Sequence, residues 1–351
     1  MKRAIVVRFS SLGDVVLTLP VMRSLREAFP AAEILFLTKA AYRPLLEGQP
    51  GIDRVVTLEE AGPGLKALRR HCRGLGHFDL ALDLHRTLRS RSCLRALDAD
   101  HHYSYRKDAL LRRLWAAGWM RGRMEGAQPH VIDRYLEPLR RFGITPAHTV
   151  PELLIPPEKL SAVRKLLVET GVRDPDRIAV VVPGARWPNK RWLPASFAAV
   201  AAGLRDTEGL EPVIAGDVSD QPAAEAVRTL IPGGAPLLAG RTGLMELAAL
   251  LKIARIVIAN DSGPAHLAAA VGTPLIALFG PTHEAFGFAP RGEQVRVISH
   301  ALACRPCTVH GGLRCQHRRR ACLNDITPDE VLAAARELLL HRAGSATKQG
   351  S

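Results

Sequence analysis

A carboxylate stands where the first apolar segment of the chain gives way to a helical pattern. Residues 3–9 predict a short strand, Ser10-Ser11-Leu12-Gly13 follows it, and a helical pattern begins at Val15. Asp14 therefore lies at a helix start, where backbone amides can hold an anion and a carboxylate can take a proton from a hydroxyl nucleophile. An ordinary N-cap aspartate explains the same position equally well.

A cluster of cations follows a second apolar segment. Residues 177–182 predict a strand that ends in Pro183-Gly184, and Arg186, Lys190 and Arg191 come within the next seven residues. The glycine permits close backbone approach, and cations at this density suit a pyrophosphate. The segment is neither a P-loop nor a dinucleotide fingerprint. The alternative is a solvated basic turn whose two tryptophans serve packing.

A third polar segment leads from a strand into a helix. Asn260-Asp261 follows the apolar residues 255–259, and Ser262-Gly263 precedes a helical pattern that contains His266. The amides of Ser262 and Gly263 would lie where the helix begins, so they can hold phosphate oxygens, and His266 can donate to the same group. A lone histidine is more often structural, but the glycine-containing strand end favours a phosphate site.

Four cysteines near the C-terminus have the spacing C-x2-C-x7-C-x6-C: Cys304, Cys307, Cys315 and Cys322. In a cytosolic chain disulfides are improbable. The spacing allows a structural zinc site with four cysteine ligands or an iron–sulfur cluster, and it equally allows reduced or partly paired thiols in a loop. A catalytic metal is not indicated.

Strand-like and helical segments alternate along both halves of the chain. Further strands are predicted at residues 33–38, 55–58, 78–84, 212–216 and 274–279. Such alternation predicts parallel sheets covered on both faces, and a proline-rich stretch around 146–157 separates two sets of elements. We therefore expect two doubly wound α/β domains, over 1–155 and 156–326, that face a central cleft at the carboxyl ends of their strands.

The C-terminal segment carries the signals of a helix start. Thr327 as N-cap, Pro328 at the first position and Glu330 three residues after the cap predict a helix over 327–343. The remaining residues, 344–351, are expected to form a disordered tail.

Charge and composition narrow the function classes. The 351 residues carry 48 Lys and Arg against 34 Asp and Glu, a net charge of +14, and residues 61–145 alone hold 17 against 8. Such a surface attracts polyanions: nucleic acid, an anionic membrane face or phosphorylated sugars and lipids. Aromatic residues make up only 5%, and no recognition helix or RNA-binding motif is visible, so nucleic acid is disfavoured. A dehydrogenase or epimerase would need a glycine fingerprint after the first strand, and none is present.

No signal peptide or membrane-spanning run is recognisable, so we expect a cytoplasmic protein.

One segment could still touch a membrane surface. Its apolar residues are Leu110, Leu111, Leu114, Trp115 and Trp119, and its cations are Arg112, Arg113, Arg121 and Arg123. The pattern predicts either a basic amphipathic patch on an anionic leaflet or a core-facing helix with snorkelling arginines.

Taken together, these segments resemble the ADP-heptose:lipopolysaccharide heptosyltransferases, glycosyltransferase family 9. The resemblance rests on residues 8–20, on Pro183-Gly184-Ala185 with Lys190-Arg191-Trp192, on residues 260–274 and on Phe279-Gly280-Pro281-Thr282, in this order. The cysteine segment beginning Cys304-Arg305-Pro306-Cys307 also resembles many members. The resemblance covers roughly residues 1–340.

The resemblance implies a GT-B-like fold of two Rossmann-like domains, the N-terminal one binding the acceptor and the C-terminal one the nucleotide-sugar. The 327–343 helix is then expected to pack back on the N-terminal domain. The implied reaction is an inverting, metal-independent transfer of heptose from ADP-heptose to an inner-core sugar of lipopolysaccharide, with no cofactor required. The implied partners are this donor, an anionic lipopolysaccharide acceptor and the inner leaflet of the cytoplasmic membrane, but no nucleic acid.

By the same resemblance, Asp14 matches the general base, and Gly13 and Arg89 lie where members contact the acceptor. The implied donor and phosphate contacts are Ala185, Arg186, Lys190, Asp261, Ser262, Gly263 and His266. The implied adenosine contacts are Gly216, Asp217 and Thr242. Many members have a Gln-Gly type sequence where this chain has His85-Arg86, which leaves open a same-family transferase with another acceptor, such as a capsule or O-antigen sugar or another glycoconjugate.

Overall fold

The chain folds into two units in a computed structural model that describes residues 1–119, 128–317 and 319–348. The first unit consists of Met1–Asp108 and Pro129–Leu154, and the second of Ala109–Gln128 and Ile155–Ser351. The sequence had assigned residues 109–128 to the first half. The structure groups the described residues of this segment with the second unit, where Trp115 packs on His283 and Phe286.

Five parallel strands form the sheet of the first unit, in the order β3-β2-β1-β4-β5. Their bounds are β1 (Arg3–Val7), β2 (Glu33–Thr38), β3 (Arg54–Thr57), β4 (His77–Asp83) and β5 (Asp98–Ser104). The parallel sheet and its first four strands confirm the prediction. Strand β5 escaped prediction because its sequence, DADHHYS, is a polar edge strand with no fully buried residue.

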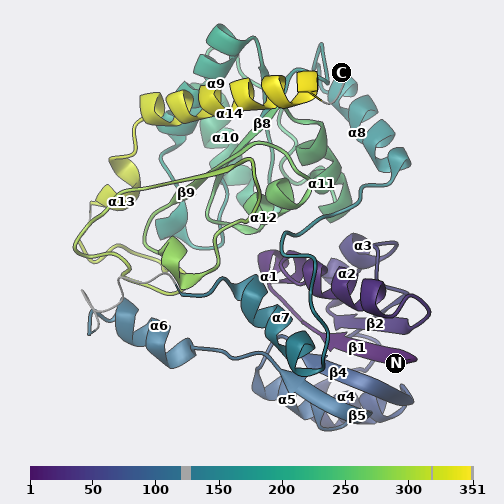
Figure 1. The fold of residues 1–351 in the computed structure, drawn as a ribbon. Helices are drawn as coiled ribbons and strands as arrows, with labels where there is room; N and C mark the ends of the chain where they lie inside the picture. The colour runs from purple at the N-terminus through teal and green to yellow at the C-terminus, as the bar shows by residue number, and fades with distance from the viewer. Residues whose placement is uncertain (120–127, 318, 349–351) are drawn as a thin grey trace. The chain divides into compact units, whose positions relative to one another are not determined.

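Helices cover both faces of the first sheet (Figure 1). Their bounds are α1 (Leu12–Val16), α2 (Leu19–Ala28), α3 (Arg43–Leu46), α4 (Gly64–Arg73), α5 (Leu88–Leu94) and α7 (Val131–Arg141). The first helical pattern restarts at Leu19 with Pro20 in its first turn, as the proline predicted. Helix α7 packs on α2, while α4 and α5 pack on each other and bury Leu68 and Cys93 against Ile5 and Phe78.

The second unit has its own five-stranded parallel sheet, in the order β10-β9-β8-β6-β7. Its strands are β6 (Ile178–Val182), β7 (Glu211–Ile214), β8 (Ile256–Asn260), β9 (Leu275–Phe279) and β10 (Val295–Ser299). Strands β6, β8 and β9 are buried throughout, which explains why their apolar runs were recognisable. Strand β10 was missed because this edge strand buries a single residue.

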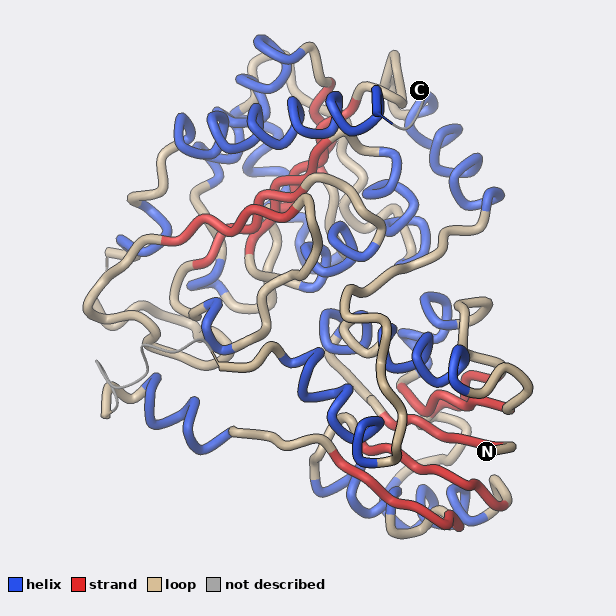
Figure 2. The backbone as a smooth tube through the Cα atoms, viewed as in Figure 1, coloured by secondary structure: helices blue, strands red, loops and turns tan. Residues whose placement is uncertain are grey.

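Helices also cover the second sheet, whose strands lie side by side between them in Figure 2. The helices of the second unit are α6 (Ala109–Ala116), α8 (Pro157–Glu169), α9 (Pro194–Glu208), α10 (Gln221–Leu230), α11 (Leu244–Ile253), α12 (Gly263–Ala270), α13 (Ala321–Asn324) and α14 (Pro328–Lys348). Helices α9, α10 and α14 share one apolar core with the sheet. Helix α12 contacts β8, β9 and α11, and α8 packs on α11.

The C-terminal helix α14 belongs to the second unit. The Thr327 hydroxyl accepts a hydrogen bond from the Glu330 amide at 3.2 Å, which supports the expected N-cap. Val331 and Ala335 pack with Phe197 of α9 in one core, so the described part of this helix packs within the second unit. The helix also continues to Lys348, where a disordered tail was expected, and 349–351 lie outside the described residues.

Each sheet has a switch point, where consecutive connections leave in opposite directions and a crevice opens at the strand ends. In the first sheet it lies between β1 and β4, and in the second between β6 and β8. Strand β1 leads into the segment with Asp14, β6 into the basic turn, and β8 into Asp261. The three segments singled out by their chemistry therefore follow strands at the two switch points.

Candidate active site

The Asp14 carboxylate contacts Arg8, Ser11 and Tyr135 of the first unit. Its Oδ2 atom lies 2.7 Å from Nη2 of Arg8 and accepts hydrogen bonds from the hydroxyl and amide of Ser11 at 2.7 and 3.1 Å. The Tyr135 hydroxyl lies 3.4 Å from Oδ1. Ser11 is the N-cap of α1 and Asp14 is its third residue, so Asp14 is not itself the N-cap, although its carboxylate accepts from the N-cap amide in a capping box. The side chain is still 19% exposed, which leaves the carboxylate within reach of a ligand.

Arg8 is the buried partner of this ion pair. Its Nε atom donates to the Ser10 carbonyl at 2.8 Å, and Nη1 donates to the Leu84 carbonyl at 2.5 Å and to the Tyr135 hydroxyl at 2.8 Å. Burial, the largest single influence, would lower the pKa of Arg8, but the adjacent Asp14 carboxylate, Tyr135 and Tyr105 together outweigh it and raise this pKa. A fixed positive charge therefore stands at the end of β1.

The loop after β4 lies at the same switch point. The fully buried Asp83 accepts hydrogen bonds from the amides of His85 and Arg86, both at 2.8 Å, and from the Ser90 hydroxyl at 3.0 Å. Arg86 has a φ of 55°, a left-handed conformation that favours glycine. Burial and the charge of Arg8 lower the pKa of His85 to about 4, so His85 is neutral near pH 7.

The two residues expected at the acceptor follow neighbouring strands. Gly13 is buried inside α1, after β1, and Arg89 is exposed at the second position of α5, after β4. Both residues therefore follow strands that border the switch point of the first sheet, β1 and β4.

Asn260 ties the ends of β6 and β8 together in the second unit. This fully buried side chain donates to the Pro183 carbonyl at 2.8 Å and accepts from the Trp192 amide at 3.0 Å. A Cβ atom on Gly184 would lie 2.0 Å from the carboxylate carbon of Asp220, so glycine is required there for space. The basic turn thus starts from a fixed position beside β8.

Asp261 and Lys190 form the second Asp–cation pair. The Lys190 Nζ atom lies 2.5 Å from the Asp261 carboxylate, which also accepts from the Thr282 hydroxyl at 2.6 Å. Loops that follow β6, β8 and β9 are therefore joined at one carboxylate. The Ala185 carbonyl accepts from Nε of Arg191 at 2.9 Å, whereas Arg186 is exposed.

The start of α12 provides polar groups beside this pair. Gly263 is the first residue of the helix, and Ser262 is its N-cap in an extended conformation. The Ser262 hydroxyl oxygen is buried and has no hydrogen-bond partner within the part of the chain that the structure describes. His266 is 8% exposed in the same helix. A donor hydroxyl and helix amides in this position can bind an anion.

The three residues expected at the adenosine lie on neighbouring segments. The Gly216 carbonyl accepts from the Gly240 amide at 3.0 Å, which brings the segment with Thr242 beside the end of β7. Asp217 is exposed next to Gly216. The Thr242 hydroxyl is buried without a hydrogen-bond partner among the described residues.

A family model matches most of this chain. The family model described as glycosyltransferase family 9 (heptosyltransferase) matches residues 67–314, which is more than half of the chain. The chain belongs to glycosyltransferase family 9. It is therefore a glycosyltransferase of the heptosyltransferase family, as the resemblance implied.

Relatives of this glycosyltransferase match over nearly their whole lengths. Lipopolysaccharide heptosyltransferase 3 of Escherichia coli (strain K12) is 28% identical, covering 96% of this chain and 98% of the relative. Lipopolysaccharide heptosyltransferase 2 of the same strain is 27% identical, covering 96% and 99%.

Solved structures match the fold. The E. coli ADP-heptose lipopolysaccharide heptosyltransferase II has a TM-score of 0.75 at 25% identity, covering 98% of this chain and 100% of that chain. A family 9 glycosyltransferase from Veillonella parvula DSM 2008 has a TM-score of 0.80 at 23% identity, covering 97% and 98%. The predicted GT-B fold is thus confirmed.

The cysteine segment of the glycosyltransferase packs on the basic turn. The Asn189 amide donates to the Gly312 carbonyl at 3.3 Å, and the Gly312 amide donates to Oδ1 of Asn189 at 2.8 Å. Arg320 donates to the carbonyls of Pro188 and Arg191 at 3.0 and 3.1 Å. A hollow of about 320 Å³ lies between the segment and the turn. These hydrogen bonds therefore fix the loop that carries Lys190 against the cysteine segment.

The four cysteines of this segment are free thiols, and burial raises the pKa of Cys307 and brings that of Cys322 to about 11. Among the described residues, no three His, Cys, Asp or Glu side chains are arranged to hold a metal ion. The structure thus gives no ligand set, within those residues, for the structural metal that the spacing allowed. In the first unit, Cys72 and Cys93 are also free and buried, with their sulfurs 2.8 Å apart.

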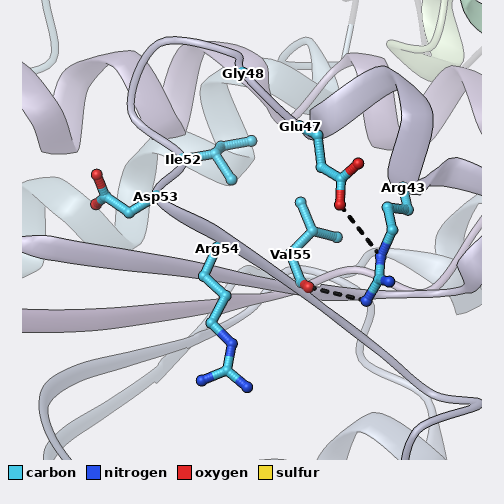
Figure 3. Close-up of a pocket in the computed structure, with 7 residues that line it drawn as sticks. All are labelled: Arg43, Glu47, Gly48, Ile52, Asp53, Arg54 and Val55. Carbon is cyan, nitrogen blue, oxygen red and sulfur yellow. Dashed lines mark hydrogen bonds and ion pairs between the residues drawn. The ribbon is translucent and has the colours of Figure 1, made fainter.

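A second hollow, of about 230 Å³, lies on the first unit away from its switch point. It is lined by Arg43, Glu47, Gly48, Ile52, Asp53, Arg54 and Val55. Figure 3 shows Arg43 directed to the Glu47 carboxylate and the Val55 carbonyl, at 3.5 and 3.2 Å. Because Arg54 begins β3, this hollow lies near the amino end of that strand, opposite the end where ligands of such sheets bind.

Proposed function

We propose that this glycosyltransferase moves a heptose from ADP-heptose to an inner-core sugar of lipopolysaccharide with inversion, and that Asp14 is the general base. The observation that carries the proposal is the Asp14 carboxylate, which is fixed by Arg8 and Ser11 at the switch point yet is 19% exposed. The near full-length similarity to lipopolysaccharide heptosyltransferases supports the choice of donor and acceptor.

In the proposed reaction, Asp14 accepts the proton of an acceptor hydroxyl as its oxygen attacks the anomeric carbon. The bond between that carbon and the β-phosphate oxygen breaks, and ADP leaves with the bonding electron pair. Lys190, Arg186 and the amides of Ser262 and Gly263 stabilise the negative charge that grows on the phosphate. The reaction needs no redox partner and, in this proposal, no metal or other cofactor.

The donor half of the proposal is supported by groups in the second unit. Lys190 is 12% exposed, and among the described residues its ammonium has Asp261 as its single side-chain partner, so further N–H donors can reach a phosphate. The buried hydroxyls of Ser262 and Thr242 lack partners within the described residues and could bind donor oxygens, and His266 could add a donor to the same phosphate. Gly216 and Asp217 are proposed beside the adenosine, and Ala185 beside the diphosphate.

The acceptor half rests on the first unit. Gly13 and Arg89 are proposed acceptor contacts, and the excess of cations between residues 61 and 145, most of which lies outside 109–128, suits carboxylates and phosphates of the inner core. The His85-Arg86 pair distinguishes this chain from many members. It supports the second candidate, transfer to a capsule, O-antigen or other glycoconjugate sugar.

Membrane contact is proposed through a smaller surface than the sequence indicated. On α6, Trp115 packs on Phe286 with ring centroids 5.1 Å apart, and Arg112 lies over the Phe288 ring, so both face the protein. Leu110 and Trp119 are 71% and 82% exposed. Arg121 and Arg123 lie outside the described residues. Within the described ranges, no helix meets the length and hydropathy of a membrane span. We propose a cytoplasmic enzyme that touches the inner leaflet through these two apolar side chains.

One assay tests donor, acceptor and membrane contact together. The protein is incubated with ADP-heptose and truncated lipopolysaccharides in anionic phospholipid vesicles, while ADP release and vesicle flotation are measured. We expect ADP release to require an inner-core acceptor, and flotation to fall when Leu110 and Trp119 are both replaced by Ser. Release with a capsule or O-antigen precursor alone would favour the second candidate. Release with ADP-glucose but not ADP-heptose would contradict the donor.

A further inference from the structure

We infer that Arg8 and Tyr135 are positioning residues that hold the Asp14 carboxylate ionised and in one orientation. The inference rests on the proposed function, in which Asp14 is the base. It assigns a role in turnover to two residues that need not touch either substrate.

Arg8 is enclosed by its own unit. Four of its five N–H donors are used, on the carbonyls of Ser10 and Leu84, on the Tyr135 hydroxyl and on Asp14. The side chain is only 7% exposed. The guanidinium therefore cannot turn toward a ligand without breaking several charge-assisted hydrogen bonds. Its charge acts on Asp14 rather than on a substrate.

Tyr135 connects the two partners. It is fully buried on α7, and its hydroxyl accepts from Nη1 of Arg8 at 2.8 Å and lies 3.4 Å from Oδ1 of Asp14. Its ring meets that of Tyr105 edge-on, with centroids 4.9 Å apart, which fixes the direction of the hydroxyl. Burial raises the pKa of Tyr135, so the hydroxyl keeps its proton and can donate to the carboxylate.

Other titratable groups near Asp14 come from the loops after β4 and β5. His85 is neutral near pH 7, because burial and Arg8 lower its pKa to about 4. Tyr105 faces Arg8 and Tyr135, and Lys107 lies 3.5 Å from the His85 carbonyl. With His85 neutral, Arg8 supplies a positive charge in direct contact with the Asp14 carboxylate.

A cation beside a carboxylate favours its ionised form. Without Arg8, the carboxylate takes up a proton at higher pH, and a protonated base cannot accept the proton of the acceptor hydroxyl. The acidic limb of the pH–rate profile must then move to higher pH.

The experiment measures kcat and kcat/KM against pH for Arg8→Met, Arg8→Lys, Tyr135→Phe and Asp14→Asn, with ADP affinity from calorimetry. We expect Arg8→Met to lower kcat about 100-fold and to move the acidic limb up by about 1–2 pH units. Arg8→Lys keeps the charge but not the forked geometry, so we expect about a tenfold loss of kcat with little movement of the limb. We expect Tyr135→Phe to lower kcat about threefold to tenfold at an unchanged limb. ADP affinity should stay within about twofold throughout.

Arg134→Met is the matched control. Arg134 is another buried arginine of the first unit, 3.2 Å from Asp108, and its loss should lower the thermal midpoint without moving the acidic limb. An unmoved limb in Arg8→Met, together with an inactive Asp14→Asn, would overturn the inference and leave the proposed function standing. Activity in Asp14→Asn would instead remove the proposed base. If Arg8→Met does not fold, Arg8→Lys decides: wild-type kcat overturns the inference, and a loss of kcat with unchanged ADP affinity and thermal midpoint supports it.

Discussion

Asp14 and Asp261 each follow the middle strand of their own sheet, Asp14 within α1 after β1 and Asp261 just before α12 after β8, and each is paired with a cation. In the first unit the cation is the enclosed partner, since the side chain of Arg8 is 7% exposed and that of Asp14 is 19% exposed. In the second unit the two partners are nearly equal, with Lys190 at 12% and Asp261 at 14%. One pair thus exposes its carboxylate more than its cation, and the other exposes both partners about equally.

The hydrogen bonds explain this difference. Arg8 uses four N–H donors within its own unit, so it is fixed, and in the proposed mechanism Asp14 is the partner that reacts. Asp261 is fixed by Thr282 and Lys190, and the ammonium keeps N–H donors for a ligand. In the proposed mechanism, an ion pair between an aspartate and a cation can therefore provide either a general base or a phosphate-binding cation, depending on which partner the fold immobilises.

The largest expected difference between the two ion pairs is in kcat, which Asp14→Asn should lower far more than Asp261→Asn. Asn has the shape of Asp but cannot accept a full proton, so we expect Asp14→Asn to lower kcat about 10³–10⁴-fold with ADP affinity unchanged. Asp261→Asn keeps Lys190 charged, so we expect a loss of about tenfold or less, mainly in KM for the donor. Steady-state kinetics with ADP release would check both. Equal losses of kcat in the two variants would show that the two ion pairs do not differ in their roles.

Lys190→Met should have the next largest effect. Loss of a cation that contacts phosphate removes charge-assisted hydrogen bonds, so we expect the Kd for ADP to rise about tenfold to 100-fold. Calorimetric titration with ADP measures this directly. The control is the double variant Lys190→Met with Asp261→Asn, in which no carboxylate is left buried without its cation. If the double variant bound ADP as the unsubstituted protein does, Lys190 would not be a ligand of the phosphates.

Local sequence patterns were enough to find the central strands and the segments that follow them. Strands β6, β8 and β9 are continuous apolar runs, and Asp14, Lys190 and Asp261 each come soon after such a run. The edge strands β5 and β10 could not be found this way, because an edge strand with few buried residues has no apolar pattern.

Partners distant in sequence were also beyond prediction. Tyr135 lies 121 residues from Asp14, and Gly312 lies 123 residues from Asn189, so only the fold brings them together. Arg8 did carry a local signal that sequence analysis missed. A charged residue directly after four buried strand residues must find a partner, because an unpaired buried charge is costly.

The smallest expected effects are changes in stability on substitution of Gly184 and Arg86, two residues near the switch points whose space or backbone conformation is restricted. In the second unit, Gly184 is needed for space, because a Cβ atom would meet the Asp220 carboxylate. In the first unit, Arg86 holds a φ of 55° where L-residues other than glycine are strained by about 1–2 kcal/mol. Its side chain recovers part of this by donating to the Tyr105 carbonyl at 3.2 Å.

Arg86→Gly and Arg86→Ala both remove that side-chain hydrogen bond, but only glycine relieves the backbone. We therefore expect Arg86→Gly to have a free energy of unfolding about 1 kcal/mol above that of Arg86→Ala, and within about 1 kcal/mol of the unsubstituted protein. Urea unfolding curves measure both differences. Gly184→Ala should act oppositely, losing about 1–3 kcal/mol through overpacking. Equal stability of the two Arg86 variants would mean that the left-handed conformation carries no strain at this position, and only Gly184 would then restrict the backbone at a switch point.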